Sequence, residues 1–252
     1  EGGMNYLRGY IDKESLPTLG TVSRNQNGYP IGYFFGYKAI GVFQTQEEID
    51  NYISPATGKP IQPNAVPGDT KFEDLNGDGV ISDDNEDRTM IGKPNPDWIV
   101  GLTVAADWNG FDLSAFFQGS FGADVFDALR RYELAAVNYT SDALERWTGP
   151  GTSNSMPRIV LGDTPKNFRP STLLVHDASF LRLRNLQVGY TLPAQLTRKA
   201  YIQRLRFYAS FDNLLTITGY KGMDPEIGST MGIDKGVYPQ ARVYTFGLNL
   251  TF

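Results

Sequence analysis

The residues best suited to chemistry lie in one acidic segment, residues 74–89, which reads DLNGDGVISDDNEDRT. Asp74, Asn76 and Asp78 occupy alternate positions and Gly79 follows them, as in the first half of an EF-hand-type calcium loop. Side chains at alternate positions of a tight loop converge on one point, and Ca²⁺ prefers about six to eight oxygen ligands. The spacing therefore predicts a structural Ca²⁺ site, to which Val80 contributes its backbone carbonyl.

The closing ligand of this predicted site departs from the template. A full EF-hand loop ends on a bidentate carboxylate, whereas this chain has Asn85 at that position. Asp84, Glu86 or Asp87 could supply the last ligand only if the loop bulges. The alternative is an acidic solvated turn that binds no cation tightly. The flanking stretches look extended rather than helical, so we do not expect a calmodulin-like switch.

The composition leaves few candidates for catalysis. The 252 residues include no cysteine, which excludes disulfides, cysteine-based zinc sites and thiol nucleophiles. The single histidine, His176, has no catalytic partner near it in the sequence, and we interpret it as a loop or packing residue. Carboxylate pairs such as Asp124 with Asp127 would hydrolyse glycosides only across a cleft, with one pKa raised. We therefore predict that the chain is not an enzyme.

Charge and hydropathy exclude further classes of protein. With 23 basic and 28 acidic residues the formal net charge is −5, and no Lys/Arg-rich run suggests nucleic-acid binding. No stretch approaches the roughly 18 apolar residues of a membrane-spanning helix, and the first residues do not resemble a signal peptide. Hydropathy does not exclude a membrane β-barrel, because the strands of a barrel alternate polar and apolar residues.

The clearest periodicity in the chain is the two-residue alternation of β-strands. Asn109-Gly110 separates two such segments and predicts a tight hairpin turn. In a later segment the apolar parity changes near Asn185, which predicts a β-bulge. A weaker extended segment covers residues 16–24, and residues 123–147 have helical character. The predicted strands cover residues 30–43, 98–108, 111–122, 179–192, 204–215 and 242–252.

The connections between these strands alternate between short and long. Short turns on one side and long loops on the other are typical of outer-membrane barrels, whose short turns face the periplasm. Aromatic residues at strand ends, such as Trp98, Trp108 and Phe111, resemble interfacial girdles. We therefore predict an all-β chain, an antiparallel transmembrane β-barrel segment. Its extracellular loops would be residues 44–97, 123–178 and 216–241.

A soluble fold is the alternative. In that case the chain is a secreted, calcium-stabilised β-sandwich that binds glycans through exposed aromatic side chains such as Tyr29, Phe34 and Phe35. A soluble sandwich gives no reason for the alternation of loop lengths, so we favour the barrel.

In the barrel interpretation, the polar residues of the strands face the lumen. These side chains could contact a polar solute or satisfy one another in a hydrogen-bonded wall, and we favour the wall for most of them. The residues are Arg182, Arg184, Arg206, Tyr208, Asp212 and Asn213.

Several runs of the sequence, in the same order, resemble the C-terminal part of SusC/RagA-type TonB-dependent transporters of the Bacteroidetes outer membrane. The runs are GYPIGYFFGYKAIGVFQTQEEID from residue 28, PGDTKFEDLNGDGVISDDNEDRTMIGKPNPDW from residue 67, SFLRLRNLQVGYTLP from residue 179, FYASFDNLLTITGYKGMDPE from residue 207, and the terminal YTFGLNLTF. The resemblance covers most of the chain from about residue 28 onward.

This resemblance implies a barrel of about 22 strands in the outer membrane of a Gram-negative bacterium, with an N-terminal plug and a SusD-like surface lipoprotein as partner. It implies import of oligosaccharides, or of peptides in the RagA-like branch, energised by TonB through an N-terminal portion that we do not find in these residues. It also makes Asp87, just before Arg88-Thr89, the best candidate for the displaced calcium ligand. The last strand resembles a barrel-assembly signal, carried by Tyr244, Phe246, Leu248, Leu250 and Phe252.

Overall fold

The computed structural model describes residues 22–83, 86–130, 132, 138–227 and 231–252. The chain divides into two compact units. The first, here called the strand unit, comprises Pro96–Ala123, Asp177–Glu226 and Gly236–Phe252. The second, here called the loop unit, comprises Glu1–Asn95, Asp124–His176 and Ile227–Lys235. Each unit is described by itself.

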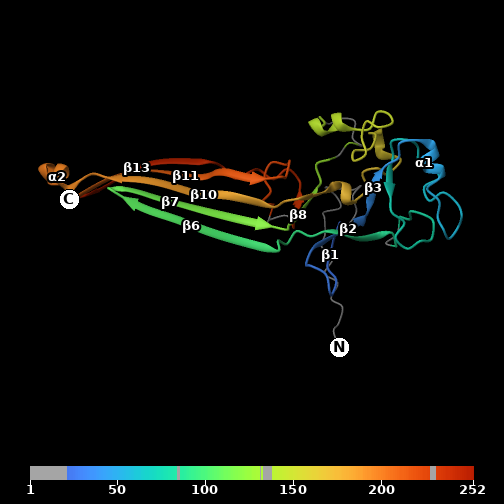
Figure 1. The fold of residues 1–252 in the computed structure, drawn as a ribbon, viewed down its shortest axis with the longest axis horizontal. Helices are drawn as coiled ribbons and strands as arrows, with labels where there is room; N and C mark the ends of the chain where they lie inside the picture. The colour runs from blue at the N-terminus through green and yellow to red at the C-terminus, as the bar shows by residue number, and fades with distance from the viewer. Residues whose placement is uncertain (1–21, 84–85, 131, 133–137, 228–230) are drawn as a thin grey trace. The chain divides into compact units, whose positions relative to one another are not determined.

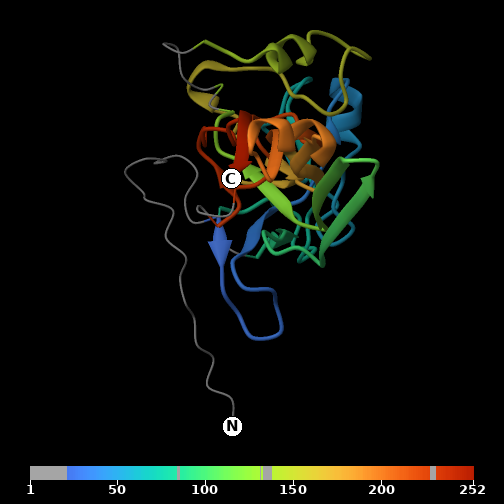
Figure 2. The same cartoon turned by 90° about the vertical axis from the view of Figure 1, so that its left-hand side faces the viewer.

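The strand unit is one antiparallel sheet of five strands in the order β13-β11-β10-β7-β6 (Figure 1). Its strands are β6 (Trp98–Trp108), β7 (Phe111–Phe121), β10 (Phe180–Thr191), β11 (Arg204–Thr218) and β13 (Val243–Thr251). A short helix α2 (Ala194–Thr197) and a 3-10 turn η4 (Arg198–Ala200) connect β10 to β11. Figure 2 views the unit from the end at which α2 and the C-terminus lie.

These five strands begin and end within three residues of the bounds expected from the sequence. Neighbouring strands are consecutive along the chain within this sheet, so the connections alternate between its two ends. Those at the α2 end are short, and those from β7 to β10 and from β11 to β13 are long. The all-β fold class is therefore confirmed.

The two faces of the sheet differ in chemistry. Strand register aligns Leu102 with Phe117, Val188 with Leu113, and Phe207 with Leu248, so apolar side chains lie together on one face. That apolar face is exposed along its length, with Trp98 at 71% and Phe246 at 76% of their maximal exposure. The opposite polar face carries Asp112, Gln187 and Ser210 at neighbouring positions. Soluble proteins rarely leave so large an apolar surface open to water.

A β-bulge interrupts β10 where the sequence predicted one. The register shifts between Leu183 and Asn185 against both neighbouring strands, and against β7 Arg184 is the extra residue. The bulge reverses the parity of the strand and keeps Leu181 and Leu186 on the same apolar face.

The sheet has two open edges. In the part of the chain that the structure describes, β6 pairs only with β7, and β13 pairs only with β11. An open edge presents a row of backbone N–H and C=O groups, which closed barrels satisfy with a further strand.

The loop unit is built from short elements. One sheet joins β1 (Ser23–Arg24), β2 (Tyr33–Tyr37) and β5 (Arg88–Gly92); a second pairs β3 (Ala39–Val42) with β4 (Thr70–Phe72). A third contains β8 (Asp124–Asp127), β9 (Val175–Asp177) and β12 (Ile233–Asp234). The helical elements are α1 (Gln46–Asp50), η1 (Ser141–Glu145), η2 (Leu161–Asp163) and η3 (Thr172–Leu174). Among the described residues, no helix is long and apolar enough to cross a membrane.

The prediction of a barrel strand at residues 30–43 is wrong. The structure has two short strands there, β2 and β3, in separate sheets of the loop unit. All five residues of β2 are buried, and Phe34 packs in a core with Val22 and Phe126. Gly36 contributes to the tight fit, because a Cβ there would overlap the Pro170 carbonyl. An element buried on both faces belongs to a protein core and has no lipid-facing side.

The prediction of helical character at residues 123–147 is wrong at β8, which is a strand, and holds only for the five-residue 3-10 helix η1. Residues 131 and 133–137 lie outside the described part, as do residues 16–21 of the weak N-terminal strand. The second core cluster of the loop unit gathers Tyr132, Ala143, Met156 and Phe168.

Candidate functional site

A buried arginine lies on the polar face near the start of β10. Arg182 is 2% exposed, and its Nε donates to Thr216 Oγ1 at 2.9 Å. Its Nη2 lies 2.6 Å from Asp224 Oδ1 and its Nη1 lies 3.1 Å from Glu226 Oε2. A guanidinium presents its donors in a fixed fork, so a single side chain engages both carboxylates.

Arg184, the extra residue of the bulge, strengthens the same network. Its Nη2 lies 2.5 Å from Glu226 Oε1, and its Nε donates to Gln118 Oε1 at 2.7 Å. Two arginines of β10 therefore attach the start of the β11–β13 connection to the polar face of the sheet.

Asp224 is the best-buried carboxylate of this network. Burial by itself raises its pKa, but the backbone N–H groups of Gln240 and Glu226 and the Arg182 guanidinium lower it by more. The net pKa of Asp224 is below its ordinary value. The Gln240 backbone nitrogen lies 2.9 Å from Asp224 Oδ2, and the Glu226 backbone nitrogen lies 2.9 Å from Asp224 Oδ1.

A second set of contacts lies nearer the α2 end of the polar face. Arg206 Nε donates to Asp112 Oδ1 at 2.9 Å, and the guanidinium lies 5.2 Å from the centre of the Tyr208 ring. Tyr208 aligns with Gly247 on β13, where a Cβ would overlap the tyrosine ring. Asp212 accepts from Asn185 Nδ2 at 2.7 Å. Arg182, Arg184, Arg206 and Asp212 therefore have polar partners within the strand unit, mostly side chains outside the predicted set. Their contact with a solute stays a prediction.

The acidic loop is ordered by its own carboxylates. Asp74 accepts from the backbone N–H of Gly77 at 2.8 Å and of Gly79 at 2.9 Å. Asn76 accepts from Asp78 N–H, and Asp78 accepts from Val80 N–H. Gly77 and Gly79 have positive φ angles of 77° and 91°, which L side chains adopt at a cost.

Asp87 closes the loop from its far end. It is fully buried, and it accepts from Leu75 N–H at 3.1 Å and from Ser82 N–H at 2.9 Å. Asp87 therefore connects the two ends of the loop. Across the described residues, no group of three or more Asp, Glu, His or Cys side chains forms a metal cluster. Asp84 and Asn85 lie outside that part, and the calcium site stays a prediction.

The last strand presents an apolar row. Tyr244, Phe246, Leu248 and Leu250 lie on the apolar face of the sheet and are all exposed, as is Phe252 at the chain's end. The apolar face thus extends over the final strand.

No protein-family model matches this chain. The chain is 34% identical to TonB-dependent receptor P3 of Formosa agariphila over 238 residues, which cover 90% of this chain and 23% of that receptor. It is 30% identical to TonB-dependent receptor SusC of Bacteroides thetaiotaomicron over 233 residues, 92% of this chain and 21% of SusC. The chain belongs to the SusC/RagA-like TonB-dependent receptors.

Solved structures agree with this family. The SusC/RagA-like chain matches the structure of the RagAB peptide transporter with a TM-score of 0.68 and 28% identity, over 92% of this chain and 24% of that one. It matches the RagAB peptide importer in its open-open state with a TM-score of 0.66 and 26% identity. The chain spans about a quarter of the length of these relatives. It is thus an all-β portion of an outer-membrane barrel protein.

Two details of the sandwich alternative are corrected in this SusC/RagA-like chain. Phe34 and Phe35, expected as exposed glycan-binding aromatics, are buried; Tyr29 is exposed and stacks on Tyr33. The apolar faces do not pack against a second sheet of the strand unit, which contains one sheet among the described residues.

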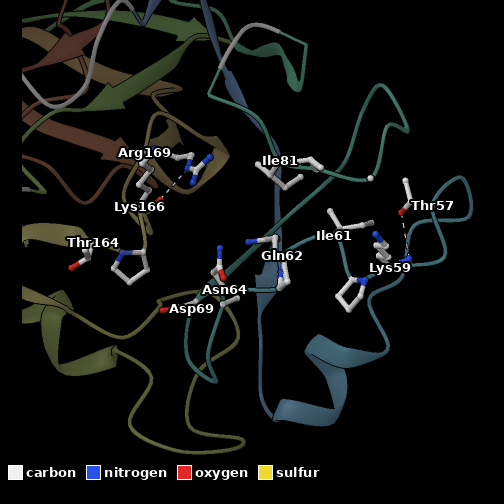
Figure 3. Close-up of a pocket in the computed structure, with 16 residues that line it drawn as sticks. Thr57, Lys59, Ile61, Gln62, Asn64, Asp69, Ile81, Thr164, Lys166 and Arg169 are labelled. Atoms are coloured by element: carbon white, nitrogen blue, oxygen red, sulfur yellow. Dashed lines mark hydrogen bonds between the residues drawn. The ribbon is translucent and has the colours of Figure 1, made fainter.

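Sequence reasoning missed a cavity of about 720 Å³ in the loop unit (Figure 3). Three segments line it, residues 57–69, 79–81 and 164–169. They are far apart in the sequence and share no motif, so no pattern in any one of them signals a pocket.

Proposed function

We propose that this chain supplies C-terminal barrel strands and three long extracellular loops to a TonB-dependent outer-membrane importer of oligosaccharides, which acts with a SusD-like surface lipoprotein. One observation carries the proposal: a five-stranded sheet with an exposed apolar face and two open edges, in a chain 30–34% identical to TonB-dependent receptors. The lipid bilayer covers the apolar face, and strands from the remainder of the barrel pair with β6 and β13.

The alternation of connections supports this orientation. Short turns of outer-membrane barrels lie on the periplasmic side. The Asn109-Gly110 turn and the α2 connection are short, so the long connections face outward. The plug and the TonB contact belong to the remainder of the receptor, and the chain itself catalyses no reaction.

The choice of oligosaccharide over peptide rests on the family resemblance and on the identity to SusC, which at 30% exceeds that to RagAB. Peptide import is the second candidate, because the solved neighbours are peptide importers. An uptake assay separates the two. Deleting the receptor should abolish uptake of a labelled oligosaccharide and leave uptake of labelled peptides intact. Loss of peptide uptake alone would favour the second candidate, and unchanged uptake of both would refute import.

We also propose that the acidic loop binds Ca²⁺ through Asp74, Asn76, Asp78, the Val80 carbonyl and Asp87. The oxygen-rich donor set suits a hard cation, and the buried Asp87 joins the two ends of the loop. The ion would stiffen the loop when bound. Calcium titration of the intact receptor should show binding that Asp74→Ala/Asp78→Ala abolishes, with faster proteolysis of the loop. Equal affinity in both proteins would exclude the site.

We infer further that the last strand carries the barrel-assembly signal, because its alternate residues form an exposed apolar row that ends at Phe252. Phe252→Ser should lower the amount of receptor in the outer membrane, whereas Thr251→Ser should not. Equal amounts of both variants would exclude this role.

A further inference from the structure

The chain contains three Asn-Gly pairs, which begin at Asn27, Asn76 and Asn109. A backbone nitrogen can attack the side-chain amide of the asparagine before it, and a glycine favours the attack because it has no Cβ to hinder the approach. The three pairs share one reactive dipeptide, so the fold decides which of them reacts. We propose that Asn27 is a spontaneous modification site, which deamidates through a succinimide formed with Gly28.

The reaction involves only the Asn27-Gly28 pair and water. The Gly28 nitrogen bonds to Asn27 Cγ, the Cγ–Nδ2 bond breaks, and ammonia leaves with the proton of the Gly28 N–H group. Water then opens the succinimide ring at either of its carbonyls, which yields aspartate or isoaspartate. The product carries a carboxylate where the chain had a neutral amide, and isoaspartate also lengthens the main chain.

The Asn27-Gly28 pair lies in the connection from β1 to β2, an open loop beyond the ends of both strands (Figure 2). Both residues are exposed, and a Cβ at Gly28 would meet no atom within 4 Å. Among the described residues, neither the Asn27 side chain nor the Gly28 nitrogen has a hydrogen-bond partner. The turn bond from Tyr29 N–H to the Gln26 carbonyl, at 3.1 Å, involves neither reacting group. The nitrogen and the amide are therefore free to approach each other.

The Asn76-Gly77 pair is held by hydrogen bonds of the acidic loop. The attacking nitrogen, that of Gly77, donates to Asp74 Oδ1 at 2.8 Å. The Asn76 amide donates to Asp78 Oδ2 at 3.0 Å and to Glu86 Oε2 at 2.9 Å. Its oxygen accepts from Asp78 N–H at 3.0 Å. These bonds have to break before the reacting atoms can reach attack geometry, so the fold protects Asn76.

The Asn109-Gly110 pair is fixed by packing in the hairpin turn. Strand register pairs Trp108 with Phe111 across the turn. The Gly110 carbonyl accepts from Thr191 N–H at 2.7 Å, and a Cβ at Gly110 would lie 2.8 Å from the Thr191 oxygen. A glycine confined in this way has little room to rotate its nitrogen toward the Asn109 amide. Asn109 is therefore also protected.

The test compares the three pairs within one protein by mass spectrometry. The intact receptor in detergent is incubated at neutral pH in heavy-oxygen water, both folded and unfolded in guanidinium chloride, and is then digested at acid pH in ordinary water. The heavy oxygen marks each asparagine hydrolysed during the incubation. In the folded receptor, Asn27 should deamidate faster than Asn76 or Asn109 by about fivefold or more, the factor that one net hydrogen bond contributes to an equilibrium. In the unfolded receptor the three rates should converge.

Two variants test the cause. Asp74→Ala removes the acceptor of the Gly77 N–H group and should accelerate deamidation of Asn76 by about fivefold. A calcium chelator keeps this measurement independent of the proposed Ca²⁺ site. The rate at Asn27 in the same variant is the matched control and should not change. Asn27→Gln should abolish the signal at that position, because glutamine has to close a larger ring, which forms more slowly.

Several results would overturn the proposal. One is an Asn27 that stays intact in the folded receptor or reacts no faster than the other two asparagines. Another is a preference for Asn27 that persists after unfolding, because the local sequence and not the fold would then be its cause. An unchanged rate at Asn76 in Asp74→Ala would refute hydrogen bonding as the protection. None of these measurements depends on import, so their outcome is independent of the proposed function.

Discussion

Buried ion pairs attach the β11–β13 connection to the polar face of the sheet. Arg182 and Asp224 are 2% and 6% exposed and face each other at 2.6 Å. A buried pair of this kind contributes little net stability compared with apolar residues, but removing one partner leaves the other charge buried without compensation.

Arg182→Met should therefore destabilise the receptor strongly. We expect a loss of about 3–5 kcal/mol, the range for breaking a buried pair, measured by denaturant unfolding in detergent micelles. The matched control is Arg204→Met on β11, because Arg204 is exposed and should change stability by less than about 0.5 kcal/mol. A similar loss in both variants would contradict the buried-pair explanation.

The lowered pKa of Asp224 also predicts a dependence on pH. A carboxyl whose pKa is lower in the folded state than in the unfolded one adds stability above its unfolded pKa, about 3.9 for Asp. That stability is lost as the pH falls through the lower folded pKa. Proteolysis of the β11–β13 connection by an acid-active protease should therefore accelerate only below about pH 4.

Asp224→Asn tests that dependence. The variant should remove the acid-induced step, because the amide does not titrate, whereas Glu145→Gln at an exposed position of the loop unit should retain it. A step of the same size in Asp224→Asn would assign the effect to another group.

At the scale of secondary structure, the sequence is informative wherever one face of a strand differs from the other. The alternation in β6, β7 and β11 reveals the strands, and the parity change around Arg184 reveals the bulge. The alternation is absent in β2, whose residues are all buried, so its aromatic run looked like one more barrel strand.

The candidate sites also differ in how far the sequence predicts them. Local spacing indicated the acidic loop, because its residues lie within a single turn-rich segment. Glu226 and Asp224 could not be matched to Arg182 and Arg184 in advance, since about forty residues separate them in the sequence. The cavity depends on three such distant segments.

The hairpin turn offers a test at this scale. Asn109 and Gly110 have φ angles of 55° and 87°, as a primed two-residue turn requires. A Cβ at Gly110 would also lie 2.8 Å from the Thr191 carbonyl oxygen. Gly110→Ala should lower the free energy of unfolding by at least about 1 kcal/mol.

The control for this turn is Gly219→Ala, in the same unit. Gly219 has no positive φ, and a Cβ added to it would meet no atom within 4 Å. Thermal unfolding in detergent should show a lower midpoint for the Gly110 variant alone. An equal shift in both would show that the turn conformation is not the cause.

For the whole molecule, the proposed lipid contact predicts that the two faces of β6 respond differently to charge. Leu102, near the middle of the strand, is exposed on the apolar face, and Thr103 points to the opposite face. Leu102→Lys should cost about 2–4 kcal/mol near the bilayer centre, whereas Thr103→Lys should cost much less. Folding into vesicles, followed by the heat-dependent shift in gel mobility, measures the difference. Equal behaviour of the two variants would contradict lipid contact on the apolar face.

The open edges of β6 and β13 have a consequence for biogenesis. Each unpaired backbone group in hydrocarbon costs several kcal/mol, while the apolar face is unfavourable in water. The sheet is therefore unfavourable both in the bilayer and in water until both edges are paired. These strands should enter the membrane only together with their neighbours, and a nascent receptor that fails to close should be left to periplasmic chaperones and proteases.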